Sequence, residues 1–169
     1  MSNKIFKPVS KYEAYPFLHE DSLMCDYEIL TDRYASAMSN IYGLLKDEDK
    51  PNVKMICELV YHANPCIRNK CEITDSDLNT LVEIMNGYDK YMPKYFVLPL
   101  DTNPVSGAAE VLRAEAKQIV RLIYRIEREE GIDVDVKVYD VFNITSEIMF
   151  GIAMKYAEIP ERFISRTYK

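Results

Sequence analysis

The sequence contains no tryptophan, only five glycines and only two histidines among its 169 residues. So little glycine leaves little room for long irregular loops and favours helices. No apolar run approaches the roughly 20 residues that a membrane-spanning helix needs, and the N-terminal stretch has no apolar signal core. The net charge of −6 argues against general nucleic-acid binding, which needs a concentrated basic surface. We therefore expect one globular, cytoplasmic domain over residues 1–169 that acts neither in a membrane nor on nucleic acid.

Helical periodicity begins near residue 21, after an irregular arm at residues 1–20. A first apolar stripe predicts one long helix from Leu30, Tyr34, Ala37, Ile41 and Leu44. Pro51 suits the first turn of a second helix that stops near residue 64. Thr74, followed by two aspartates, predicts the N-cap of a third helix that ends between residues 87 and 91.

The clearest helix is predicted over residues 104–130, with Gly131 as its C-cap. Its apolar seam steps by three and four through Ala109, Leu112, Ala116, Ile119, Ile123 and Ile126. A fifth helix with Val141, Thr145, Ile148 and Ile152 on one face is closed by Pro160, before a basic tail at residues 160–169. The connector before the long helix holds residues 95–98 as either a short strand or a buried extended loop. This pattern predicts an all-α fold, a five-helix up-and-down bundle.

A polar stripe runs along the flank of the long helix beside the seam, formed by Arg113, Lys117, Arg121, Tyr124 and Arg128. A line of cations on one flank can hold a polyphosphate through charge-assisted hydrogen bonds. The alternative is a solvated face paired with Glu110, Glu115 and Glu127. On the fifth helix, Asn143 is polar within an apolar run. It suggests a ligand contact, a buried hydrogen bond or the capped start of a helix.

Four segments together resemble the ATP:cob(I)alamin adenosyltransferases. The loop Phe96-Val97-Leu98-Pro99 is followed by the run GAAEVLRAEAKQIVR and later by FNITSEIMF, in the order of that family's motifs. The earlier run ILTDRYASAMSNIYGLL is similar to the family's first helix, with Asp32 and Ser36 in register.

The resemblance implies a five-helix bundle of the cobalamin adenosyltransferase type, assembled as a homotrimer. It also implies transfer of the 5′-deoxyadenosyl group from ATP to cob(I)alamin, with triphosphate as the leaving group. The implied ligands are ATP, Mg²⁺ and cobalamin, and a flavin or other reductase would supply the electron.

The resemblance also implies roles for single residues. Phe96 matches the aromatic residue beside the lower face of the corrin, with Val97 and Leu98 next to it. Other positions match the ATP site: Arg113, Lys117 and Arg121 at the polyphosphate, Asn143 at the nucleotide, and Asp32 in a salt bridge with Arg113. Of these, Phe96, Arg113 and Asn143 are the implied catalytic residues.

The chain departs from the family's pattern at several positions. The usual glycine-rich phosphate loop near the N-terminus is missing, since the first glycine is Gly43. Lys117 replaces an arginine and Glu147 replaces an aspartate, and a lysine lacks the arginine's bidentate fork. These differences keep two alternatives open. One is a non-catalytic corrinoid-binding or carrier protein on the same fold, and the other is a structural or interaction bundle without a ligand.

The cysteines raise one further alternative. The family's ethanolamine-utilisation type also lacks the glycine-rich start, and it binds a metal through a histidine and cysteines. His62, Cys66 and Cys71 lie close together in sequence, but their spacing fits no standard zinc motif. We expect reduced thiols here, either as an additional metal site or as packing cysteines in a helix hairpin.

Overall fold

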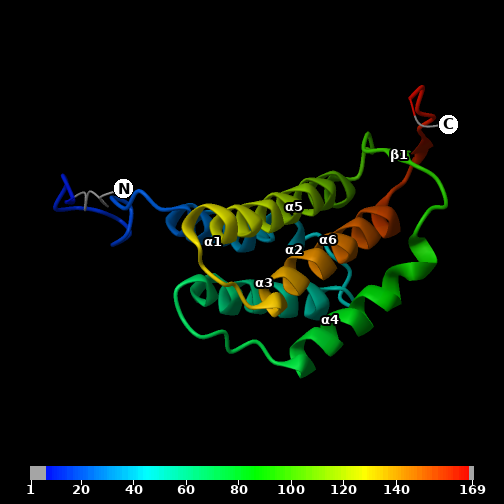
Figure 1. The fold of residues 1–169 in the computed structure, drawn as a ribbon. Helices are drawn as coiled ribbons and strands as arrows, with labels where there is room; N and C mark the ends of the chain where they lie inside the picture. The colour runs from blue at the N-terminus through cyan, green and yellow to red at the C-terminus, as the bar shows by residue number, and fades with distance from the viewer. Residues whose placement is uncertain (1–6, 168–169) are drawn as a thin grey trace.

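The computed structural model describes residues 7–167, so the first six residues of the predicted arm and the last two of the predicted tail lie outside it. Most of this part of the chain is helical, and α5 and α6 lie side by side along the molecule (Figure 1). The helices are α1 (Leu23–Ala37), α2 (Ser39–Tyr42), α3 (Lys50–Ala63), α4 (Asp75–Tyr88), α5 (Pro104–Glu130) and α6 (Val136–Tyr156), with short 3₁₀ turns η1 (Asn64–Ile67) and η2 (Asp89–Tyr91). No helix among residues 7–167 is long and apolar enough to cross a membrane.

Local sequence signals set most helix ends. Thr74 caps α4 through a capping box: its hydroxyl accepts from the Asp77 backbone N–H at 3.2 Å, and its own N–H donates to the Asp77 carboxylate at 2.8 Å. Pro51 lies in the first turn of α3. Gly131 ends α5 with φ of +70°, a left-handed conformation that favours glycine. These predictions are confirmed.

The core lies where α5 and α6 face α1, α3 and α4. Every residue of the predicted α5 seam is buried, and burial of each leucine or isoleucine among them stabilises the fold by roughly 1.5–3 kcal/mol. Phe142 of α6 is fully buried and meets the rings of Tyr27 and Tyr34 edge-on, with both centroid distances at 6.2 Å. The long helices therefore form one rigid scaffold.

The first helix is shorter than predicted. The chain tightens at Met38, whose N–H bonds to the Ala35 carbonyl three residues back at 3.2 Å, and the separate helix α2 follows. The predicted single helix through Leu44 is therefore wrong, and Leu44 lies exposed beyond α2.

α4 packs against α6 at Gly151. A Cβ atom added to Gly151 would lie 2.5 Å from the Tyr88 Cβ, so α6 can approach the end of α4 only because this position has no side chain. This contact at Tyr88, the last residue of α4, holds the beginning of the connector to α5 against α6.

A buried carboxylate joins the same region to α3. Asp49, which is 2% exposed, accepts hydrogen bonds from the Tyr88 and Tyr156 hydroxyls at 2.6 Å each and from the Lys155 ammonium at 2.8 Å. Lys155 also pairs with Glu48 at the surface. The network connects the C-terminal ends of α4 and α6.

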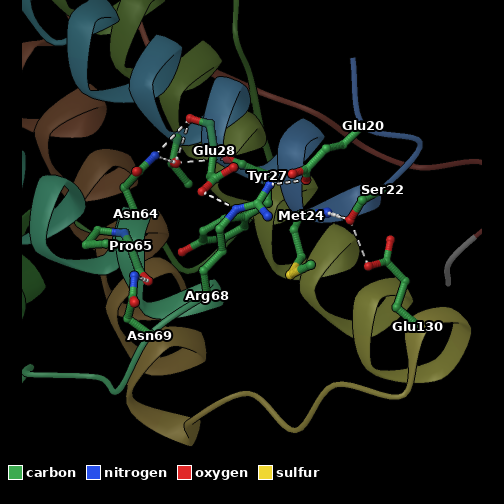
Figure 2. A network of polar contacts seen from close by, with 11 residues as sticks. Glu20, Ser22, Met24, Tyr27, Glu28, Asn64, Pro65, Arg68, Asn69 and Glu130 are labelled. Carbon is green, nitrogen blue, oxygen red and sulfur yellow. Dashed lines mark hydrogen bonds and ion pairs between the residues drawn. The ribbon is translucent and has the colours of Figure 1, made fainter. Parts of the chain in front are cut away.

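A second network anchors the N-terminal arm (Figure 2). The Arg68 guanidinium bonds to the buried Glu28 carboxylate and to Glu20 of the arm at 2.7 Å each, and it lies 4.1 Å from the Phe17 ring centroid. At the other side of the same view, Glu130 of α5 accepts from the Ser22 hydroxyl at 2.9 Å. The arm is thus held to the bundle by charged side chains.

The chain also forms a two-stranded antiparallel sheet that the sequence pattern did not predict. β1 (Val97–Leu98) pairs with β2 (Glu161–Arg162), with Val97 opposite Arg162. The pairing holds residues 161–162 of the basic tail against the connector, and of the two interpretations of residues 95–98 the short strand is confirmed. Both strands lie where the chain's C-terminal end passes the connector from α4 to α5 (Figure 1).

Candidate functional site

The clearest hollow lies beside β1, where α5 and α6 meet the connector from α4. Its volume is about 510 Å³, within the range of small-molecule sites. We call it the α5–α6 hollow. Three segments line it: Pro93, Lys94, Tyr95, Phe96, Val97 and Pro99 of the connector, Glu110, Arg113 and Lys117 of α5, and Glu147 and Phe150 of α6.

The hollow brings together residues that the sequence linked only through motif order. Phe96 and Val97 come from the connector, while Arg113 and Lys117 lie one turn apart on α5. Phe96 is 70% exposed, so most of its ring is open to a ligand in the hollow. An exposed aromatic ring and helix-borne cations thus line the same hollow.

The charges in the hollow are partly balanced. The Arg113 Nε donates to the Glu110 carboxylate at 2.6 Å, and its guanidinium lies 5.7 Å from the Phe150 ring centroid. Glu147 adds a second carboxylate. Lys94 and Lys117 have no ion pair within residues 7–167, so their ammonium groups are available to an anionic ligand.

Two predicted residues lie on the same flank but outside the hollow. Arg121 is one turn beyond Lys117 on α5, and Asn143 is one turn before Glu147 on α6. Both side chains are exposed. Asn143 lies inside α6, whose N-cap is Asp135, so the helix-start and buried-hydrogen-bond interpretations are both wrong.

Leu98 does not line the hollow, whereas its neighbour Val97 does. Successive side chains of a strand point to opposite faces, and this alternation separates the two residues of β1. Of the two residues predicted to border a ligand, only Val97 therefore lines the hollow.

The predicted salt bridge between Asp32 and Arg113 does not form within the chain. Asp32 of α1 is exposed and accepts a hydrogen bond from the Tyr61 hydroxyl at 3.2 Å. The Arg113 guanidinium bonds to Glu110, its neighbour one turn back on α5. Arg33, next to Asp32, is the α1 residue that pairs with α5, through Glu115 at 2.5 Å.

The predicted metal site is not assembled. No group of three or more histidine, cysteine, aspartate or glutamate side chains in the described part of the chain is arranged to hold an ion. Cys66 Sγ lies 2.9 Å from Cys71 Sγ, but it contacts the backbone carbonyl of His62 rather than the imidazole, which is exposed. Burial and the hydrogen bond to Cys71 raise the pKa of the Cys66 thiol to about 12, which disfavours the thiolate that a metal needs.

A second hollow of about 540 Å³ lies beside the first, lined by Arg33, Pro99, Gly107, Glu110, Val111, Arg113, Ala114, Glu115 and Gln118. Sequence reasoning missed it, because Glu115 looked like part of a solvated face. In the structure Glu115 is 7% exposed, and one of its carboxylate oxygens has no partner. Lys94 and Tyr95 of the first hollow were also missed, since a connector gives no periodic signal.

Fold and site together define a helical bundle with a ligand-sized hollow at the junction of its two longest helices and an irregular connector. Solved structures share the fold. An arginine-to-lysine variant of the PduO-type ATP:co(I)rrinoid adenosyltransferase from Lactobacillus reuteri, complexed with ATP, superposes with a TM-score of 0.73 at 19% identity and covers 88% of this chain and 90% of its own.

Two further structures of the Lactobacillus reuteri PduO-type enzyme are complexed with cobalamin and ATP. The phenylalanine-to-alanine variant has a TM-score of 0.72 at 18% identity over 88% of this chain and 89% of its own. The phenylalanine-to-histidine variant has a TM-score of 0.73 at 18% identity over 90% and 88%. No protein-family model and no curated protein matches the chain. The chain therefore has the helical fold of these adenosyltransferases, which confirms the predicted bundle of the cobalamin adenosyltransferase type.

Proposed function

We propose that the protein transfers the 5′-deoxyadenosyl group of ATP to the cobalt of a reduced corrinoid. In this step the cobalt electron pair of cob(I)alamin attacks C5′ of ATP and the C5′–O5′ bond breaks. That bond's electron pair leaves with triphosphate, so cobalt is oxidised by two electrons as the carbon–cobalt bond forms. The observation that carries the proposal is the meeting of Phe96 with Arg113 and Lys117 in one hollow.

Phe96 would lie against the lower face of the corrin. An exposed aromatic ring at the mouth of the hollow can exclude water and an axial ligand from that face, and a cobalt centre with fewer axial ligands accepts an electron more readily. A flavin or other reductase in the cytoplasm would supply that electron. Val97 and Phe150 would add apolar contacts around the same ring system.

The α5 flank would hold the triphosphate. Lys117 has no ion pair within residues 7–167 and would take one phosphate, while Arg121 continues the cationic line one turn further. Asn143, which is exposed on α6 one turn before Glu147, would orient the nucleotide. Mg²⁺ would neutralise part of the phosphate charge. Glu147 fits such an ion, because magnesium is held by one or two carboxylates together with substrate phosphates.

We further propose that three copies assemble. Ile29 of α1 and Val111 of α5 are 46% and 57% exposed, and Val111 borders the second hollow beside Arg33. An exposed apolar side chain beside a polar hollow is suited to contact with another copy. In such an assembly Asp32 of one copy would be free to approach Arg113 of another. Light scattering of the purified protein tests the assembly.

The paired charge of Arg113 favours a second candidate, a corrinoid carrier that does not form the carbon–cobalt bond. Glu110 already neutralises Arg113, and Glu147 places a further negative charge beside Lys117. Such a lining weakens the attraction for a bare triphosphate without affecting an apolar contact with the corrin.

The test is an anaerobic absorbance assay with ATP, Mg²⁺ and chemically reduced cobalamin. The enzyme converts the cob(I)alamin spectrum into that of a light-sensitive alkylcobalamin. The carrier leaves that spectrum unchanged but shifts bound cob(II)alamin toward a four-coordinate spectrum, and no change in either experiment would refute both candidates. Phe96→Ala should abolish the four-coordinate shift and retain ATP binding. Leu100→Ala is the matched control, since Leu100 is equally exposed on the same connector, at 74%, and does not line the hollow.

A further inference from the structure

The connector that carries Phe96 is held by the C-terminal tail. Within residues 7–167, all polar contacts of residues 93–100 are with the tail. β1 pairs with β2, and the Phe163 N–H donates to the Phe96 carbonyl at 2.7 Å. The Arg162 guanidinium lies 5.6 Å from the Tyr95 ring centroid. No helix of the bundle bonds to this stretch. The position of Phe96 therefore depends on where the tail lies.

The tail is in turn fixed by one carboxylate, Asp101. Its Oδ2 accepts from the backbone N–H groups of Glu158 and Ile159 at 2.9 and 2.8 Å. Its Oδ1 accepts from the N–H of Asn103, the N-cap residue of α5, at 2.9 Å. Asp101 thus ties the point where the chain leaves α6 to the point where it enters α5.

Further contacts reinforce the same junction. The Glu158 carboxylate accepts from the Thr102 hydroxyl at 3.1 Å and from the Asn103 side-chain amide at 3.3 Å. Desolvation acts to raise the pKa of Asp101, but the backbone N–H groups of Ile159, Asn103 and Glu158 outweigh it and lower the pKa. The carboxylate is therefore charged at neutral pH, which strengthens each of these bonds. We call Asp101 together with residues 157–163 the tail clasp.

We propose that Asp101 is a positioning residue for Phe96, acting through the tail clasp. Phe163, which bonds to Phe96, is only four positions after Ile159, which Asp101 holds. A two-stranded ribbon on its own is marginally stable in water, so β1 and β2 need an additional anchor to stay in register. The functional part of this inference rests on the proposed adenosyl transfer, whereas the mechanical part stands on the contacts alone.

Hydrogen exchange followed by mass spectrometry tests the mechanical part on the full chain without any ligand. Asp101→Ala should speed exchange several-fold in peptides covering residues 93–100 and 158–163, because a locally unfolding unit loses its anchor. Peptides from the centres of α5 and α6 should keep wild-type exchange, which shows that the bundle is intact. Asp133→Ala is the control, since Asp133 is exposed and bonds to no other described residue. Unchanged exchange in both clasp peptides would overturn the proposal.

A double-mutant cycle tests the functional part with cob(II)alamin as the substrate and reduced flavin as the electron donor, so that the assay includes the reduction step assigned to Phe96. In the wild-type background Asp101→Ala should lower kcat/KM for the corrinoid by roughly 10- to 100-fold, as misplacement by about 1 Å can do. The KM for ATP should stay unchanged. In the Phe96→Ala background the same substitution should have almost no further effect, because a residue that acts through Phe96 has nothing left to position.

Asp101→Asn keeps one acceptor oxygen and should give intermediate values in both experiments. An equal loss of kcat/KM in the two backgrounds would overturn the positioning role. If the wild-type protein itself makes no adenosylcobalamin, the proposed function fails, and the exchange experiment still decides whether Asp101 holds the Phe96 connector.

Discussion

The buried carboxylate of Asp49 gives the sharpest stability prediction. Asp49→Ala removes three hydrogen bonds, from the hydroxyls of Tyr88 and Tyr156 and from the ammonium of Lys155. Removing one partner of a buried, hydrogen-bonded charge pair costs about 3–5 kcal/mol. Glu48 still compensates Lys155, so we expect the lower end, about 3 kcal/mol. For a chain of this size the loss lowers the melting temperature by about 6–12 °C.

The assay is thermal unfolding followed by far-UV circular dichroism, with Asp47→Ala as the matched control. Asp47 lies two residues away, and its side chain is 96% exposed in a surface pair with Lys50, so its removal should not move the melting temperature measurably. Asp49 precedes α3 but makes no side-chain cap bond, so a lost cap does not confuse the comparison. Equal melting temperatures for the two variants would refute the reasoning.

The effect should also depend on pH. Burial acts to raise the pKa of Asp49, but the bonds from Lys155, Tyr156 and Tyr88 outweigh it and lower the pKa below its ordinary value. The stabilisation is therefore complete above the unfolded-state pKa of about 3.9 and is lost as the pH falls through the lowered folded value. The difference between wild type and Asp49→Ala should narrow below about pH 4, and a constant difference into strong acid would contradict this assignment.

Three shorter predictions concern other positions. Gly151→Ala should destabilise the fold by about 1–2 kcal/mol, because the added Cβ would overlap Tyr88. Gly87→Ala has no atom within 4 Å of the added Cβ and should stabilise α4 by about 0.5–1 kcal/mol. Urea unfolding measures both changes in the free energy of unfolding, and changes of the same sign would contradict the packing. Lys117→Arg should lower the KM for ATP by about 10-fold by restoring a bidentate phosphate contact, and an unchanged KM would remove this position from the ATP site. Zinc titrated into wild type and Cys66→Ser should bind both equally weakly, and tight, Cys66-dependent binding would reinstate the metal hypothesis that the side-chain geometry contradicts.

The features that were predicted correctly from the sequence are set by interactions between residues close together in the chain. The α5 seam, the capping box at Thr74 and the left-handed Gly131 are each set by residues within a few positions of one another, so periodicity and turn chemistry reveal them. The convergence of Phe96 with the α5 cations is a long-range property, and it was reached only through the resemblance to known motifs.

What the sequence did not predict depends on pairings between distant segments. β2 is two exposed residues, Glu161 and Arg162, without apolar alternation, so neither this strand nor its pairing with β1 could be inferred. For Arg113 the sequence left two partners open, Asp32 through the resemblance and Glu110 through the spacing on the helix. The structure shows the pair with Glu110, because sequence does not give the direction in which α1 faces α5. Asp101 went unnoticed because its three bonds are to backbone groups, which carry no sequence signature.

The tail clasp separates two sets of constraints along the chain. The structure of the bundle core depends on packing among the long helices, whereas the position of the Phe96 connector depends on a few contacts with an exposed tail. Substitutions in residues 93–100 and 158–163 can therefore reshape the mouth of the hollow at little cost to global stability. Evolution can therefore change the ligand specificity of the hollow while the bundle stays the same. For protein engineering, these two segments can be exchanged without redesign of the helices.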